Sequence, residues 1–289
     1  MAAINLLPEF LVYRCANLVG ETYYRLSKRR QAYALKILRN AFPQGRSESE
    51  MHRMARRGTG NLLMVAIDMM RIARWIHNGR LLDRVDVSGC AEKLPSPPVE
   101  VVTAHLGSWE PSGAALALIA GEMHVVARKF KNPLLQRYIA RTRVRSGLMI
   151  HPRRGAVRHL ARALEGGGIA VQVSDQYIRR RGVQAPFLGE IVSSERSAAS
   201  LALRYDCPVF IACCIRQGYA FRFKVYLQAI IHPVRSDNRK EDILRLVTQI
   251  NAEIGQMAVR HHDQYLWIHN RYHIKLGSAS RLGDAALTR

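Results

Sequence analysis

From Val99 onward, short apolar runs rich in β-branched residues alternate with longer stretches of helical periodicity, and this alternation limits the possible folds more than any other feature. Strands are predicted over Val99–Thr103, Met123–Ala127, Gly168–Ser174, Pro208–Cys214 and Phe221–Gln228. Helices are predicted over Ser112–Ala120, Asn132–Ser146, Gly155–Glu165, Ser194–Tyr205 and Lys240–Arg260. Strands separated by helices usually pair in parallel, because each helix returns the chain to the starting edge of the sheet. The sequence therefore predicts an α/β fold with a mostly parallel central sheet and helices on both faces.

Residues 1–45 are predicted to form a helical segment ahead of an α/β domain over residues 46–289. Leu6–Leu18 is apolar, but Glu9 and Arg14 interrupt it, and a membrane-spanning helix needs about 20 largely uncharged residues. A membrane-associating amphipathic helix in the interface is one interpretation. It would place a set of apolar side chains in lipid, namely Leu7, Phe10, Leu11, Leu18 and Tyr24. A helix docked on its own domain is the other interpretation.

Two further helices are expected before the first strand. One covers Arg29–Phe42, and the next begins at Ser47, where Glu50 three residues later completes a capping box. Gly58 and Gly60 lie inside this helix and are candidate break points, because glycine is a poor helix former.

The chain carries 44 Lys and Arg residues against 22 Asp and Glu residues, which gives a formal net charge of +22. Such an excess indicates an anionic partner: nucleic acid, an anionic membrane surface, a phosphorylated substrate or an acidic protein. A generally basic surface without a specific partner is the alternative. The sequence has no zinc-finger spacing and no RNA-recognition motif, so we do not expect nucleic acid as a partner.

The strongest candidate for chemistry is the stretch Val101–Ser112, which reads VVTAHLGSWEPS. His105 follows a predicted strand and Glu110 comes five residues later, an arrangement suited to a base and the group that orients it. Side chains five residues apart on one helix point about 140° apart, so the pair can meet only across a turn, which the glycine between them allows. Arg128 and Asp175 also follow strand ends, where active groups of parallel sheets gather. A structural role for His105 and Glu110 stays open at this point.

Motifs for nucleotides, metal ions and serine nucleophiles are absent from the sequence. It has no P-loop, no G-x-G-x-x-G, no H-E-x-x-H and no G-x-S-x-G. The five cysteines include no C-x-x-C pair, which argues against a zinc site or a disulfide framework. We therefore expect no metal and no cofactor.

Several blocks of the sequence resemble, in order, those of one enzyme family. TAHLGSWE at 103–110 resembles the H-x4-D/E signature of lysophospholipid acyltransferase-like enzymes, and in particular the H-x-G-N-W-E of their lipid A branch, the late (lauroyl/myristoyl) acyltransferases. Further similar blocks are RKFKNP at 128–133, RVRSG at 143–147, SDQ at 174–176, PFLG at 186–189 followed by Ser194, and QYLWIHNRY at 264–272. The departures are Ser108 for the usual Asn, Asn270 for Arg, Tyr272 for Trp and Gly255 for a common Glu.

The resemblance implies an enzyme that moves a fatty acyl chain from an acyl carrier protein thioester to a hydroxyl of a lipid A precursor, at the cytoplasmic face of the bacterial inner membrane. It implies His105 as the general base and Glu110 as the residue that holds one ring nitrogen. The implied substrate-binding residues are Arg128, Arg143, Arg145, Asp175 and Gln176. The alternatives are another polar lipid as acceptor (a lysophospholipid, ornithine lipid or glycolipid) and a non-enzymatic basic membrane-binding protein.

Overall fold

The computed structural model describes residues 3–274, and its centre is a seven-stranded sheet in the order β1-β9-β8-β2-β5-β3-β4. β8, β2, β5, β3 and β4 run parallel to one another, whereas β9 is antiparallel to β8 and parallel to β1. The strands are β1 (Val85–Asp86), β2 (Val99–Thr103), β3 (Met123–Val126), β4 (Leu148–His151), β5 (Ile169–Val173), β8 (Val209–Arg216) and β9 (Phe223–Ile231). The mostly parallel α/β sheet expected from the sequence is confirmed.

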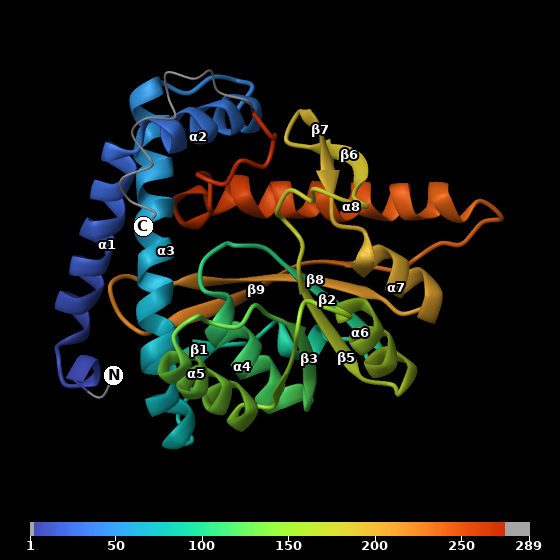
Figure 1. The fold of residues 1–289 in the computed structure, drawn as a ribbon, viewed down its shortest axis with the longest axis horizontal. Helices are drawn as coiled ribbons and strands as arrows, with labels where there is room; N and C mark the ends of the chain where they lie inside the picture. The colour runs from blue at the N-terminus through green and yellow to red at the C-terminus, as the bar shows by residue number, and fades with distance from the viewer. Residues whose placement is uncertain (1–2, 275–289) are drawn as a thin grey trace.

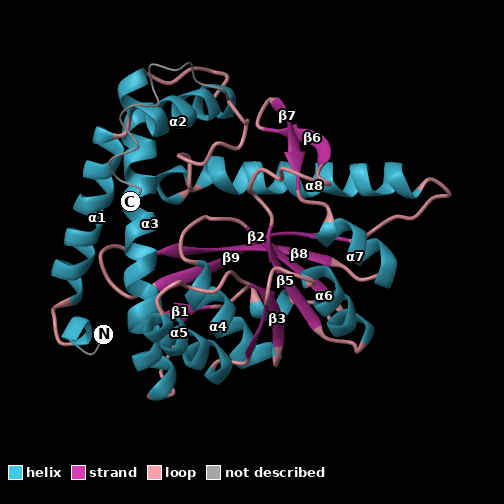
Figure 2. Ribbon diagram, in the orientation of Figure 1, coloured by secondary structure: helices cyan, strands magenta, loops and turns pink. Residues whose placement is uncertain are grey.

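Helices cover both faces of this sheet (Figures 1 and 2). They are α1 (Glu9–Leu26), α2 (Lys28–Ala41), α3 (Glu48–His77), α4 (Trp109–Ala120), α5 (Pro133–Arg145), α6 (Ala156–Glu165), α7 (Ser197–Tyr205) and α8 (Arg239–Arg260). Val102 of β2 packs in one buried apolar cluster with α6, α7 and α8. Val99 and Val101 face the opposite cluster, which contains α4 and the second half of α3. Because successive strand residues face opposite sides, and apolar clusters cover both, β2 is buried along nearly its whole length.

The long helix α3 stands beside α1 at the left of Figure 1, and glycines allow the close approach. A Cβ atom on Gly60 would lie 2.2 Å from Asn17 Oδ1 of α1. A Cβ atom on Gly58 would lie 2.2 Å from the carbonyl oxygen of Tyr265, in the segment after α8. Although both glycines are candidate break points in the sequence, α3 runs through them without interruption for 30 residues. The expected capping box at Ser47 is confirmed.

The face of α1 that points away from α3 exposes apolar side chains, among them Phe10, Leu11 and Leu18, and Leu7 is exposed just before the helix. Tyr24 was expected on the same face, but this expectation is wrong: Tyr24 is buried and its hydroxyl contacts His52 Nδ1 at 2.8 Å. None of the helices within residues 3–274 is long and apolar enough to cross a membrane. The division of the chain at residue 45 stays a prediction.

Several short strands of the structure are not predicted from the sequence pattern. β4 has only four residues, and β1 only two. β6 (Val183–Phe187) and β7 (Glu190–Ser194) form a separate antiparallel hairpin, whose strands alternate buried and exposed residues only in part. Because Ser194 ends β7, the helix expected from that residue begins only at Ser197.

A carboxyl group lies in the middle of the sheet. Glu100 of β2 is 0 % exposed, and its Oε1 accepts a hydrogen bond from Gln172 Nε2 at 2.7 Å. Its Oε2 has no hydrogen-bond partner among the described residues. Burial raises the pKa of Glu100 well above its usual range, and the Gln172 hydrogen bond offsets only part of this shift. The folded protein therefore holds Glu100 in its neutral form.

We expect Glu100→Gln to become progressively more stabilising as the pH rises. An acid whose pKa is raised in the folded state contributes its full stability below the unfolded pKa of about 4.3 and loses that stability as the pH rises toward the folded pKa. The wild type should lose up to about 1.4 kcal/mol per pH unit relative to the variant in this window. Urea unfolding of both proteins between pH 5 and pH 8 measures the difference. A difference that is constant across the series would contradict the expectation.

Candidate active site

His105 and Asp175 meet because β2 and β5 are adjacent parallel strands. The register pairs Thr103 with Val173, the last residues of the two strands. Two residues beyond each end, His105 Nδ1 lies 2.7 Å from Asp175 Oδ1. The backbone N–H of His105 also donates to Asp175 Oδ2 at 2.9 Å. Both oxygens of one carboxylate therefore hold the same histidine.

Burial and charge set the protonation of this pair. Asp175 is 3 % exposed, whereas the His105 side chain is 21 % exposed. Burial lowers the pKa of His105, but the Asp175 charge and hydrogen bond outweigh it, so the pKa of His105 lies above its usual value. Burial raises the pKa of Asp175, but its contacts with His105 and the charge of Arg271 outweigh burial and hold this pKa below its usual value. The site thus combines an ionised carboxylate with a more basic imidazole.

The structure does not join Glu110 to His105, as the sequence interpretation expected, and pairs it with Arg143 instead. α4 begins at Trp109, earlier than expected, and places Glu110 in its first turn. Both Glu110 oxygens accept hydrogen bonds from Arg143 of α5, one of them from Nε at 3.1 Å. No hydrogen bond joins Glu110 to His105 in the described structure. Asp175, expected in the acceptor site, occupies the position expected for Glu110.

The second ring nitrogen of His105 points toward an amide. Gln176 Nε2 lies 3.2 Å from His105 Nε2. An ionised Asp175 can only accept, so Nδ1 carries the proton that it shares with Asp175, and the unprotonated Nε2 of the neutral ring accepts from the Gln176 amide. The ring of Trp109 packs edge-on against the imidazole, with centroids 4.9 Å apart. Nε2 is therefore the nitrogen that can take a proton from a substrate.

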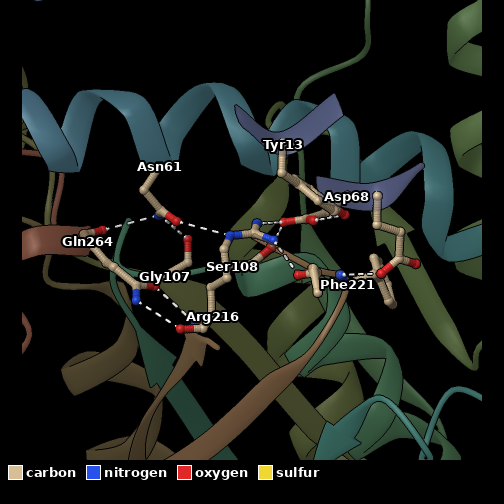
Figure 3. A network of polar contacts seen from close by, with 10 residues as sticks. Tyr13, Asn61, Asp68, Gly107, Ser108, Arg216, Phe221 and Gln264 are labelled. Carbon is tan, nitrogen blue, oxygen red and sulfur yellow. Dashed lines mark hydrogen bonds and ion pairs between the residues drawn. The ribbon is translucent and has the colours of Figure 1, made fainter. Parts of the chain in front are cut away.

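A buried polar network holds the turn that carries His105 and Glu110 (Figure 3). Ser108 Oγ donates to Asp68 Oδ2 at 2.6 Å, and Asp68 also pairs with Arg216 at the end of β8. Tyr13 of α1 donates from its hydroxyl to Asp68 Oδ1 at 2.8 Å. Asn61 Nδ2 donates to the carbonyl oxygen of Gly107 at 2.7 Å. Ser108, the departure from the family pattern, is thus fully buried and bonded to α3.

Gly107 is the point where this turn touches β8. Its φ of +61° lies in the left-handed region, and a Cβ atom there would lie 1.8 Å from the carbonyl oxygen of Cys214. Only glycine meets both conditions without a backbone shift. The sequence predicts a turn at this glycine, and the backbone of Gly107 adopts the left-handed conformation there.

A segment after α8, Gln264–Tyr272, crosses the turn that carries His105, and we call this segment the strap. The N–H of Gly107 donates to the Gln264 carbonyl oxygen and the N–H of Leu266 donates to the His105 carbonyl oxygen, both at 3.1 Å. Farther along the strap, Arg271 donates to the carbonyl oxygen of Gln176. The strap thus contacts the His105 turn and the Asp175 loop together. Its block is recognisable in the sequence, but nothing in the block says which strands it joins.

Two of the expected substrate-binding arginines lie apart from the His105–Asp175 pair. Arg128 is exposed in the loop between β3 and α5. Arg145 is exposed at the end of α5, where it lines a groove together with Arg137 and Arg141. Neither Arg128 nor Arg145 forms a hydrogen bond with the pair in the part of the chain that the structure describes. Arg143 faces inward and binds Glu110 instead, beside a small pocket with an apolar wall from α3.

The geometry is suited to general-base chemistry: a histidine lies at the carboxyl edge of a parallel sheet, a buried carboxylate holds one of its ring nitrogens, and the other faces an amide. Within residues 3–274, no group of three or more His, Cys, Asp or Glu side chains could hold a metal ion.

Comparison with known proteins identifies the family. The model of the bacterial lipid A biosynthesis acyltransferases matches residues 1–274, and the chain belongs to this family. The chain is therefore an acyltransferase. It is 25 % identical over 251 residues to the lipid A biosynthesis palmitoleoyltransferase of Escherichia coli (strain K12), covering 85 % of this chain and 79 % of that protein. The same figures hold for the lipid A biosynthesis acyltransferase of Shigella flexneri. Among solved structures, the 1-acyl-sn-glycerophosphate acyltransferase PlsC of Thermotoga maritima is similar at 13 % identity, with a TM-score of 0.36 over 84 % of this chain and 97 % of that one.

Proposed function

We propose that this acyltransferase moves a fatty acyl chain from an acyl carrier protein thioester to a hydroxyl of a lipid A precursor, with His105 as the general base and Asp175 as its orienting carboxylate. The observation that carries the proposal is the His105–Asp175 pair, 2.7 Å apart, which leaves Nε2 unprotonated and able to take a proton once the acceptor hydroxyl replaces the Gln176 amide. Membership of the lipid A acyltransferase family and the names of the relatives support the acceptor class.

The chemistry requires one base and no covalent enzyme intermediate. A hydroxyl is a poor nucleophile at neutral pH, so His105 Nε2 removes its proton as the oxygen attacks the thioester carbonyl carbon. Asp175 stabilises the imidazolium that forms. When the tetrahedral intermediate collapses, the carbon–sulfur bond breaks, and the imidazolium returns its proton to the departing thiolate.

The cationic groups have separate parts in this proposal. Arg128 and Arg145 are exposed and are candidates for the phosphates of an anionic acceptor, because the planar guanidinium matches phosphate geometry. Arg143 is engaged by Glu110, so we assign it to the structure of the site. Gln176 lies against the reactive nitrogen, and the acceptor hydroxyl takes the place of its amide during turnover. The net charge of +22 also favours encounter with an acidic carrier protein.

An acyl-transfer assay with purified protein, acyl carrier protein thioester and a lipid A precursor tests the proposal. We expect His105→Ala to remain folded and to lose turnover, since removal of the base costs roughly a factor of 10² to 10⁴. The acid limb of kcat/KM should lie above the ordinary histidine pKa of about 6.5, because Asp175 raises the pKa of His105. Near-normal turnover by His105→Ala would contradict the proposed general-base mechanism. Transfer to lysophospholipid or ornithine lipid alone would contradict the proposed lipid A acceptor.

The exposed face of α1 supports a further part of the proposal, attachment to the cytoplasmic face of the inner membrane. Leu11 is 55 % exposed, Leu18 50 % and Leu26 74 %, while Arg14 and Arg25 lie exposed beside them. Apolar side chains flanked by arginines on one helix face suit an anionic membrane interface, where the arginines reach the headgroups. The opposite face of α1 is docked on α3, so both interpretations of the segment are compatible.

We expect the double variant Leu11→Glu/Leu18→Glu to bind vesicles at least about tenfold more weakly than the wild type. Two apolar side chains would no longer enter the interface, and two negative charges would face anionic lipid. Co-sedimentation with vesicles that contain phosphatidylglycerol measures the binding. Leu244→Glu, at an exposed position of α8, is the matched control and should bind normally. Equal binding by the double variant and the control would place the membrane contact elsewhere.

A further inference from the structure

Arg271 lies near the end of the strap, and its side chain is 1 % exposed. Nη1 donates to the carbonyl oxygen of Gln176 and to that of Ser193. Nη2 donates to Ser194 Oγ at 2.9 Å and to Asn251 Oδ1 at 3.4 Å. One guanidinium therefore joins the residue after Asp175, the end of β7 and helix α8 to the strap.

The acceptors of Arg271 are all neutral, and Arg271 takes part in no ion pair among the described residues. A buried cation that has no carboxylate paired with it is costly to retain, even when neutral groups accept its hydrogen bonds. Burial lowers the pKa of Arg271, and the neighbouring Tyr265 and Asp175 offset part of this shift. The interaction is mutual, because the charge of Arg271 also lowers the pKa of Asp175. Arg271 is thus a permanent positive charge beside the carboxylate that holds His105.

Two other titratable groups near the pair, His269 and Tyr265, stay neutral near pH 7. Burial lowers the pKa of His269 to about 4, and its Nε2 accepts the backbone N–H of Tyr177 at 3.2 Å. Burial and the charge of Asp175 raise the pKa of Tyr265 well above its usual value. Arg30 donates to the carbonyl oxygen of Ile268 in the strap, on the side of His269.

We propose that Arg271 is a positioning residue for the base: its guanidinium fixes the Asp175 loop through the Gln176 carbonyl while it also binds β7 and α8, and it places a positive charge near the Asp175 carboxylate. The proposal rests on His105 and Asp175 acting as described under the proposed function. This role is consistent with the neutral acceptors of Arg271. A carboxylate paired directly with Arg271 would cancel the positive charge that acts on Asp175.

The pH dependence of kcat/KM in Arg271→Met and Arg271→Lys tests the two parts separately. Methionine removes the charge, so His105 and Asp175 are protonated more easily and the acid limb should move to higher pH, by about half a unit or more. Lysine keeps the charge but cannot reach two acceptors at once. Its acid limb should stay in place, while kcat falls at least about tenfold and the KM for the thioester changes less than twofold.

Arg30→Met is the matched control, because it also removes an arginine hydrogen bond to the strap but leaves the Asp175 loop untouched. Its acid limb should coincide with that of the wild type. An unmoved limb in Arg271→Met would overturn the proposal. If Arg271→Met does not fold, Arg271→Lys decides: reduced kcat at an unmoved limb supports the proposal, and wild-type kcat overturns it. Full activity of Asp175→Asn would instead remove the proposed orienting carboxylate, which is a separate failure.

Discussion

Asp175→Asn is expected to lower kcat by about 10³- to 10⁴-fold while the protein stays folded. The amide oxygen of the asparagine would accept the N–H of His105, as Asp175 Oδ2 does at 2.9 Å. Its NH₂ group would then face Nδ1 in place of Oδ1. A donor at this position accepts no proton from Nδ1, so the neutral ring carries its proton on Nε2 and cannot act as a base. Steady-state kinetics and thermal unfolding of the same preparation measure the two effects.

Glu110→Gln is the matched comparison, because it makes the same chemical change in the other buried carboxylate of the site. Glu110 binds Arg143 and does not touch His105. We therefore expect a smaller loss of kcat than in Asp175→Asn and an acid limb of kcat/KM at the wild-type pH. If Glu110→Gln moved the acid limb and Asp175→Asn did not, the orienting role would return to Glu110.

The exchange of roles between these two carboxylates shows what local sequence can predict. The strand ends before His105 and Asp175 are readable from apolar runs, and both residues were recognised as strand-end groups. Their contact depends on β2 and β5 being adjacent in register, and an alternating pattern of strands and helices is compatible with several strand orders. The short spacing to Glu110 favoured a local pair, but the helix start at Trp109 turned that carboxylate toward Arg143.

The polar network under the turn was not visible in the sequence for a related reason. Asp68 lies within the apolar stripe of α3, and Arg216 ends the apolar run of β8. A charged residue in an otherwise buried stripe is the available signal, because such a residue needs a partner. Its partner is 148 residues away along the chain, so periodicity alone could not identify it.

Asp68→Ala is expected to destabilise the protein by about 3–5 kcal/mol, because it leaves Arg216 charged and unpaired in the interior. Asp68 is 0 % exposed and Arg216 4 % exposed. The change also removes the hydrogen bond between Ser108 and Asp68 that holds the His105 turn on α3. We therefore expect kcat to fall in the fraction that stays folded. Urea unfolding measures the loss, and Asp83→Ala is the control. Asp83 pairs with Arg80 on the surface, and we expect its replacement to change stability by less than about 1 kcal/mol.

The double variant Asp68→Leu/Arg216→Met separates the cost of an unpaired charge from the loss of packing. Apolar side chains of similar volume often replace a buried ion pair without loss of stability, so the double variant should be more stable than Asp68→Ala. It should still have a low kcat, because Ser108 has lost its acceptor and Tyr13 has lost its hydrogen bond from α1 to α3. A double variant with wild-type kcat would show that the turn keeps its geometry through Asn61 and the strap alone. Restored stability with low kcat would mean that the chain retains this buried ion pair for the geometry of His105.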